Sequence, residues 1–343
     1  MRLVDLHPSL GGDELLARFV PPRRFADVRF ETYLPAPEHP SQAEALSRVE
    51  ALAKPADSSA GRGFFGRRKG GSAEPPGLYL DGGFGVGKTH LIAALWHASP
   101  GPGAYLTFGE LTALIGFIGM EAAVGAFGSH RLVCLDEFEL DDVANTLMTV
   151  TFLRGLLAGG DVRIATTSNS LPDRLGEGRF SAEDFKREIA AIAEHFDVVR
   201  IDGPDVRARQ TVLRDTIPAD EVDRALVAAD PATTAEDDFA DLLAHLREVH
   251  PVQYGPLVEA ADTVVIRDLA PVTNQGDALL LVALIDELYD AGRRVLTTGC
   301  AVSDLFDESY RHGGYRKKYG RAESRLSAML GESTAGTSPE PTG

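Results

Sequence analysis

Residues 81–90, DGGFGVGKTH, carry chemically useful side chains at a fixed spacing. From Gly82 to Thr89 the order is G-x-x-x-x-G-K-T, and glycines at these positions let backbone N–H groups turn inward around an anion. In such a loop Lys88 reaches the β- and γ-phosphates, while the Thr89 hydroxyl is placed to ligate Mg²⁺. The pattern predicts a nucleotide-binding loop, whose expected contact residues are Gly82, Gly83, Phe84, Gly85, Val86, Gly87, Lys88, Thr89 and His90.

Two acids and an amide complete the predicted chemistry. Asp136 and Glu137 follow the apolar run LVCL, so Asp136 is expected to bind the metal and Glu137 to act as base for an attacking water. Asn169 follows a second apolar run and is a candidate for orienting that water, although a turn residue is the alternative. Because the sequence contains no N-K-x-D guanine motif, ATP is expected rather than GTP.

The flanking runs indicate the elements that position these residues. GLYL at 77–80 predicts a strand entering the loop, and HLIAALWHA at 90–98 predicts a helix leaving it. The runs before Asp136 and Asn169 lack alternation, which is typical of strands buried on both faces of a parallel sheet. The predicted class is therefore α/β, with ligands at the carboxyl edge of a parallel sheet flanked by helices.

The rest of the chain divides by composition. Ser41 and Glu44 have capping-box spacing and predict the start of a helix, residues 217–247 look acidic and helical, and residues 263–300 read as strand, helix, strand. The expected parts are an N-terminal segment at 1–51, a flexible linker at 52–77, a P-loop ATPase core at 78–205, a smaller C-terminal α/β and helical region at 206–330, and a disordered tail at 331–343.

Charge and cysteine content narrow the class of protein. The formal net charge is −17, so most of the protein surface would repel the phosphate backbone of a nucleic acid. We therefore do not expect nucleic-acid binding. Cys134 and Cys300 lie in apolar runs, so we expect reduced core thiols and a cytoplasmic location. The apolar segment 111–128 contains Glu121 and is read as one buried helix, so no integral membrane segment is expected.

Five blocks of the sequence resemble the ZapE family of cell-division ATPases, which is of the AAA+ class. The blocks are GLYLDGGFGVGKTHL, LVCLDEFELDDVA, ATTSNSLPDRL, LIDELYD and GRAESRLSAM, spread over most of residues 25–330. The last two are the more specific, because P-loops occur in many families. The resemblance implies an AAA+ type sheet, Mg-ATP hydrolysis coupled to remodelling or regulation of a protein partner, and the division-ring protein FtsZ as that partner.

The resemblance also implies arginines that sense or complete the site. Arg321 and Arg325 match the C-terminal motif and lie four residues apart, so on a helix they share one face, and one can aim at the nucleotide while the other braces it against an acidic surface. We expect Arg325 to report the γ-phosphate, with Arg321 as the next candidate. Solvated ion pairs on a helix surface are the alternative. The arginine finger is unassigned, because Ala182 falls at the family's usual position, with Arg179 and Arg187 as nearby candidates. AAA+ rings share such arginines between subunits, so an ATP-dependent homo-oligomer, possibly a hexamer, is expected.

Three alternatives remain open from sequence alone. GGFGVGKTHL is also similar to DNA-associated helicase loaders and replication initiators, but no basic C-terminal domain follows. A nucleotide-dependent scaffold with negligible turnover is the second, although Glu137 argues against it. Phe117, Ile118 and Gly119 have the order of an AAA+ pore loop, for which helical core packing is the favoured interpretation.

Overall fold

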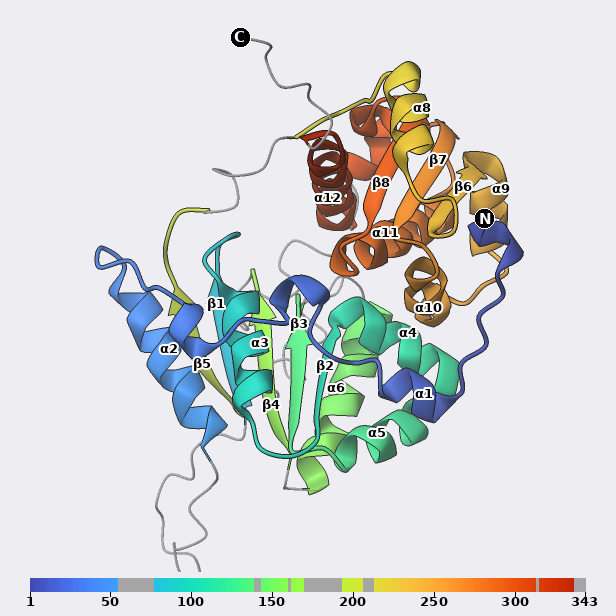
Figure 1. Ribbon diagram of the computed structural model, residues 1–343. Helices are drawn as coiled ribbons and strands as arrows, with labels where there is room; N and C mark the ends of the chain where they lie inside the picture. The colour runs from blue at the N-terminus through green and yellow to red at the C-terminus, as the bar shows by residue number, and fades with distance from the viewer. Residues whose placement is uncertain are drawn as a thin grey trace, which may run out of the picture. The chain divides into compact units, whose positions relative to one another are not determined.

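A computed structural model describes seven stretches of the chain (Figure 1), namely residues 1–54, 77–138, 143–159, 162–169, 193–205, 213–312 and 315–335. The chain divides into two compact units. We call the unit of Leu16–Pro21 and Phe25–Val206 the core unit. The other joins Met1–Leu15 and Pro22–Arg24 to Arg207–Gly343, and we call it the C-terminal unit.

The core unit is built on a parallel sheet whose order is β2-β3-β4-β1-β5. Every described pairing is parallel, which confirms the predicted α/β class. The three strands expected around the site are present, and β1 and β3 are buried along their whole length. The strands are β1 (Gly77–Gly82), β2 (Gly103–Thr107), β3 (Leu132–Asp136), β4 (Arg163–Ser168) and β5 (Phe196–Ile201).

Helices flank this sheet. They are α2 (Pro40–Ala53), α3 (Lys88–Ala98), α4 (Phe108–Ile118), α5 (Met120–Gly128) and α6 (Val143–Gly159). Helix α3 begins directly after the glycine loop, as the sequence predicts. The expected capping role of Ser41 is wrong, because Pro40 already occupies the first turn of α2 and the Ser41 hydroxyl accepts the Asp202 N–H at 2.9 Å instead.

The apolar segment 111–128 is not one buried helix. It bends by 119° between α4 and α5 at Gly119, whose φ of 85° favours glycine. Within the described residues no single helix has the length and apolar character to cross a bilayer, and only this bent pair passes when its two helices are taken together. The expectation that Phe117 packs in the core is also wrong, because this residue is 43% exposed.

The C-terminal unit contains a second parallel sheet of order β6-β7-β8. Its strands are β6 (Thr234–Asp238), β7 (Thr263–Leu269) and β8 (Arg294–Gly299), and its helices are α8 (Ala219–Ala228), α9 (Phe239–Leu246), α10 (Tyr254–Glu259), α11 (Gln275–Asp290) and α12 (Arg316–Ala335). The strand–helix–strand prediction for 263–300 is confirmed. The helical prediction for 217–247 missed β6, an acidic strand in which Asp237 is buried and accepts the Leu3 N–H at 2.8 Å.

The chain ends differ from the expected boundaries. Helix α12 continues to Ala335, past the predicted start of the tail at 331, because Leu330 is buried and the Ser333 hydroxyl accepts the Val295 N–H at 3.1 Å. The expected N-terminal segment is shared between both units and includes α1 (Gly12–Leu16). Short 3-10 helices span Leu3–Asp5, Arg23–Phe25, Phe30–Thr32, Pro251–Gln253, Val302–Asp304 and Glu308–His312.

Candidate nucleotide site

The glycine loop connects β1 to α3 within the core unit. Gly85 and Gly87 have φ values of 69° and 90°, which lie in the left-handed region where glycine is favoured. A Cβ at Gly87 would lie 2.5 Å from the Tyr33 ring, so glycine is also required there by close approach. The loop therefore has the backbone conformation and the following helix N-terminus of an anion-binding cradle.

Lys88 and Asn169 meet at this loop. The Lys88 ammonium donates to the Gly82 carbonyl at 2.8 Å, to the Gly83 carbonyl at 2.6 Å and to Asn169 Oδ1 at 2.9 Å. Asn169, which directly follows β4, thus lies within hydrogen-bonding distance of Lys88, although 81 positions separate the two. Phe84, at the tip of the loop, is 61% exposed.

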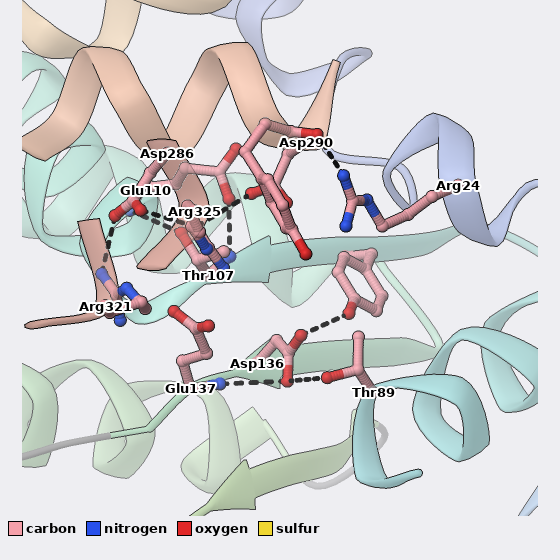
Figure 2. Close-up of polar contacts among 12 residues, drawn as sticks. Arg24, Thr89, Thr107, Glu110, Asp136, Glu137, Asp286, Asp290, Arg321 and Arg325 are labelled. Atoms are coloured by element: carbon pink, nitrogen blue, oxygen red, sulfur yellow. Dashed lines mark hydrogen bonds and ion pairs between the residues drawn. The ribbon is translucent and has the colours of Figure 1, made fainter. Parts of the chain in front are cut away.

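Asp136 lies at the carboxyl end of β3, and the Thr89 hydroxyl lies beside its carboxylate (Figure 2). Thr89 Oγ1 donates to Oδ1 of Asp136 at 3.3 Å, Tyr105 Oη donates to Oδ2 at 2.8 Å, and the Thr167 hydroxyl also donates to Oδ1. Burial, followed by the neighbouring Glu137 charge, raises the pKa of Asp136, and the three hydroxyl donors oppose that rise. The carboxylate is oriented by fixed donors on β2, β4 and α3.

Glu137 adopts a conformation that non-glycine residues rarely take. Its φ is 54°, and its backbone N–H donates to Thr167 Oγ1 at 3.0 Å and to Asp136 Oδ1 at 3.1 Å. Such a conformation costs on the order of 1 kcal/mol or more and persists where surrounding contacts fix it. Its two backbone hydrogen bonds therefore fix the point from which the Glu137 side chain leaves the strand.

The segment before α2 contacts the loop and was missed by sequence reasoning. Tyr33 Oη donates to the Val86 carbonyl at 3.1 Å, and burial raises the pKa of Tyr33 to about 12. His90, predicted to contact the nucleotide, has Nε2 at 2.9 Å from Thr32 Oγ1 and 3.2 Å from the Arg29 carbonyl. The His90 ring therefore anchors this segment. No spacing rule links Tyr33 to residue 86.

The oxygen donors fit a magnesium ion. Within the described part of the chain no group of three or more His, Cys, Asp or Glu residues is placed to hold a metal by itself. Mg²⁺ bound to nucleotides takes only one or two protein oxygens and completes its shell with phosphates and waters. The hydroxyl of Thr89 and the carboxylate of Asp136 are adjacent hard oxygen donors of that kind.

The C-terminal arginines belong to the C-terminal unit and bind an acid there. Arg321 Nη2 donates to Asp286 Oδ2, and Arg325 Nη1 donates to Asp286 Oδ1, both at 2.6 Å (Figure 2). Burial alone would raise the pKa of Asp286, but the charges of both arginines outweigh it and hold the pKa below its ordinary value. Both arginines thus pair with the same acid, and these are not solvated surface pairs, since the Arg325 side chain is 11% exposed.

An aromatic ring completes this cluster. The Arg24 guanidinium carbon lies 3.4 Å from the centroid of the Tyr289 ring and that of Arg325 lies 4.9 Å from it. Tyr289 and Asp286 both come from the LIDELYD stretch on α11. The sequence marked that stretch only by resemblance, because nothing in its pattern names the arginines it binds. Arg179 and Arg187, the arginine-finger candidates, and Ala182 lie outside the described residues.

A family model described as AFG1-like ATPase matches residues 13–224 and 214–336. The chain belongs to the AFG1-like ATPase family. This membership agrees with the resemblance seen in the sequence. It also identifies the protein as a relative of P-loop ATPases, a family in which the glycine loop and the acids after β3 are the expected nucleotide-binding elements.

This AFG1-like ATPase is 27% identical over 300 residues to the cell division protein ZapE of Escherichia coli, covering 75% of this chain and 78% of the relative. Among solved structures, the crystal structure of DnaI matches at 18% identity and a TM-score of 0.41, over 54% of this chain and 93% of that one. Domain III of the Thermotoga maritima replication initiation protein DnaA matches at 14% identity and a TM-score of 0.39, over 78% of this chain and 85% of that one.

Proposed function

We propose that this AFG1-like ATPase hydrolyses Mg-ATP at the glycine loop of its core unit. The observation that carries the proposal is the contact of Lys88 Nζ with Asn169 Oδ1 at 2.9 Å, beside the Thr89–Asp136 hydrogen bond. It gathers a phosphate-binding cation, a polar amide and a metal-binding pair at one edge of the sheet. Each group has a role in phosphoryl transfer. The remaining carboxylate, that of Glu137, is then the general base for the attacking water.

The proposed roles follow from the donors and acceptors. Lys88, released from the loop carbonyls, neutralises charge on the β- and γ-phosphates, and the loop N–H groups hold the same oxygens. Glu137 accepts a proton from the water that attacks the γ-phosphorus, while Asn169 orients that water and the bond to the β–γ bridging oxygen breaks. Thr89 and Asp136 would hold Mg²⁺, which supplies charge neutralisation at the phosphates when bound.

Two substitutions test this assignment. We expect Lys88→Ala to abolish binding of a fluorescent ATP analogue, and Glu137→Gln to keep binding while lowering turnover by at least about 100-fold, a typical contribution of a general base. The matched control is Glu121→Gln, which alters an exposed glutamate on α5 and should retain turnover. Full turnover by Glu137→Gln would remove this residue from the role of base.

We further propose a role beside the division apparatus, coupling hydrolysis to a protein partner such as FtsZ. The support is the family and the 27% identity to a cell division protein. ATP turnover measured with purified FtsZ and with single-stranded DNA separates the possibilities. Stimulation by FtsZ supports the partner, whereas stimulation by DNA alone favours the loader alternative. Measurable binding with negligible turnover under both conditions favours the scaffold. A cytoplasmic location belongs to the same proposal.

We retain Arg325 as the candidate sensor of the γ-phosphate. Its guanidinium is held by Asp286 in this structure, so sensing requires that it exchange a carboxylate for a phosphate. Arg325→Ala should then weaken ATP binding more than ADP binding, because only ATP carries the γ-phosphate. Equal weakening of both nucleotides would assign the residue to the fold of the C-terminal unit instead.

A further inference from the structure

The C-terminal unit repeats one half of the core unit element by element. Five pairs of corresponding elements begin at the same shift along the chain, as in Leu132 of β3 and Thr263 of β7, a shift of 131 residues (132 to 263). The starts of the other pairs are Lys88 and Ala219, Gly103 and Thr234, Phe108 and Phe239, and Arg163 and Arg294. The intervening helices begin at slightly different shifts, 134 residues for α5 and α10 (120 to 254) and 132 for α6 and α11 (143 to 275). The strands that follow them return to a shift of 131 residues, so the repeat has no net insertion.

Strand register repeats at the same shift. In the core unit Gly103 lies opposite Leu132, and Leu132 lies opposite Arg163. In the C-terminal unit Thr234 lies opposite Thr263, and Thr263 lies opposite Arg294. Parallel strands joined by helices are common, but unrelated units have no reason to share both spacing and register.

Hydrogen bonds outside the strand ladders repeat as well. Arg131 N–H donates to the Pro102 carbonyl at 2.8 Å, and Asp262 N–H donates to the Thr233 carbonyl at 2.8 Å. The outer edges of β2 and β6 are also capped alike by the N-terminal segment of the chain. The corresponding donors and acceptors there are Tyr105 N–H to the Phe19 carbonyl at 2.8 Å, and Glu236 N–H to the Met1 carbonyl at 3.0 Å.

The most specific correspondence is a strained residue. Among the described residues, Glu137 and Asp268 are the only two non-glycine residues with positive φ, at 54° and 56°. Each backbone N–H donates at 3.0 Å to the hydroxyl of a threonine on the next strand, Thr167 in one unit and Thr298 in the other. Both the strained residues and the threonines stand 131 positions apart.

The chemistry, in contrast, is lost from the second unit. Pro218 stands where the glycine loop has Gly87, and its φ of −57° replaces a φ of 90° that proline cannot adopt. Ala219 and Asp220 stand where the loop has its lysine and threonine. The second unit therefore has neither the backbone turn nor the cation that holds a triphosphate.

The position of the metal-binding acid is closed by ion pairs. Arg267 corresponds to Asp136, and Glu236 corresponds to Tyr105. In the core unit Tyr105 donates to Asp136 at 2.8 Å, and in the C-terminal unit Arg267 Nε donates to Glu236 Oε1 at 2.8 Å instead. Arg267 also donates to Asp223 at 2.8 Å. The guanidinium of Arg267 is partly buried and paired with two carboxylates, so its positive charge excludes a metal cation from this end of β7.

We infer that residues 219–300 are a second copy of the half-fold formed by residues 88–169, and that this copy is closed to nucleotide. Only the statement that the first copy binds nucleotide rests on the proposed function. The chain accordingly binds one nucleotide per subunit. In the second copy the threonine of β8 keeps its structural task of fixing the strained residue but has no carboxylate to orient.

The first experiment counts sites. Equilibrium dialysis of labelled ATP with Mg²⁺ against the full chain should give one nucleotide per subunit, and Lys88→Ala should bind none. Two nucleotides per subunit, or a residual site in the variant, would overturn closure of the second copy. If the unaltered protein binds no nucleotide at all, the proposed function fails, and the second experiment decides the inference alone.

The second experiment compares equivalent hydroxyls. Thr167→Val and Thr298→Val should lower the midpoint of urea unfolding, whereas Thr167→Ser and Thr298→Ser, which keep the hydroxyl, should restore it. Thr298→Val should leave ATP turnover unchanged. A Thr298→Val protein as stable as the unaltered chain, beside a destabilised Thr167→Val, would show that the two strand pairs are not held alike and would contradict the copy.

Discussion

The Thr167 hydroxyl accepts the backbone N–H of Glu137 at 3.0 Å and donates to the carboxylate of Asp136. One side chain of β4 thus positions both acids, Asp136 at the end of β3 and Glu137 directly after it. We expect Thr167→Val to cost about 1–3 kcal/mol of unfolding free energy, because the buried carboxylate of Asp136 loses a hydrogen-bond donor. ATP turnover should fall further than stability explains, and steady-state kinetics with urea unfolding measures both.

The control lies one residue away. Thr166 is equally buried, and its hydroxyl has no hydrogen-bond partner among the described residues. Thr166→Val should therefore be neutral or stabilising and should leave turnover unchanged. If Thr166→Val impaired turnover as strongly as Thr167→Val, strand packing rather than orientation of the acids would account for both.

Tyr105 positions Asp136 from the opposite side. Its 2.8 Å hydrogen bond reaches a carboxylate, and such bonds contribute about 1.5–3 kcal/mol. Tyr105→Phe should therefore raise the Mg²⁺ concentration needed for tight ATP binding by about tenfold or more. Nucleotide affinity in excess EDTA should stay unchanged. An equal loss with and without Mg²⁺ would mean a general disturbance of the loop.

Tyr254 supplies the matched control for that substitution. It is fully buried in the C-terminal unit, and its hydroxyl donates to the Leu246 carbonyl at 2.7 Å. Tyr254→Phe loses a comparable hydrogen bond and should cost stability without changing the Mg²⁺ dependence of nucleotide binding.

The Asp286 cluster predicts a dependence on pH. Because its pKa is lower in the folded protein than in the unfolded chain, the ion pairs stabilise the fold above the unfolded pKa of about 3.9, and that stability is lost as pH falls through the folded value. Asp286→Asn should cost about 3 kcal/mol at neutral pH and flatten the acid limb of the stability profile. Urea unfolding between pH 2 and pH 7 measures both.

An exposed ion pair provides the comparison. Arg224 and Asp220 pair at 2.7 Å with side chains 71% and 69% exposed. Asp220→Asn should cost a few tenths of a kcal/mol, because exposed pairs are screened by solvent. An Asp286→Asn protein that loses no more than this would contradict a stabilising role for the cluster.

Phe117 offers a test of the pore-loop interpretation. Since the side chain is 43% exposed, Phe117→Ala should cost less than about 1 kcal/mol, whereas Phe127→Ala, at a buried site on α5, should cost about 3–5 kcal/mol. A partner-handling role predicts unchanged basal turnover and lost stimulation by the protein partner. Retained stimulation would remove Phe117 from that role.

Assembly is the last expected outcome. If a neighbouring subunit supplies the arginine finger, ATP should promote oligomers of Glu137→Gln, which retains nucleotide, and light scattering should detect an increased mass. Lys88→Ala should stay at its nucleotide-free mass in the same buffer. Full turnover by a monomer at high dilution would contradict a shared active site.

The sequence by itself determined the local parts of the site. Glycines in a fixed order, a lysine and a threonine specify the loop because the turn and the helix N-terminus form within a few residues. The runs before Asp136 and Asn169 specify strands because both faces are buried. Family membership was also readable, since LIDELYD and the C-terminal arginine motif are contiguous.

Only the tertiary structure decided which distant groups meet. Asp136 accepts hydrogen bonds from Tyr105 and Thr167, each 31 residues away on a neighbouring strand, and Asp286 accepts hydrogen bonds from Arg321 and Arg325 of α12. The second copy was invisible for a related reason. Its strand β6 is acidic, and correspondences such as Phe108 with Phe239 are sparse, because burial and register preserve a half-fold with few identical side chains.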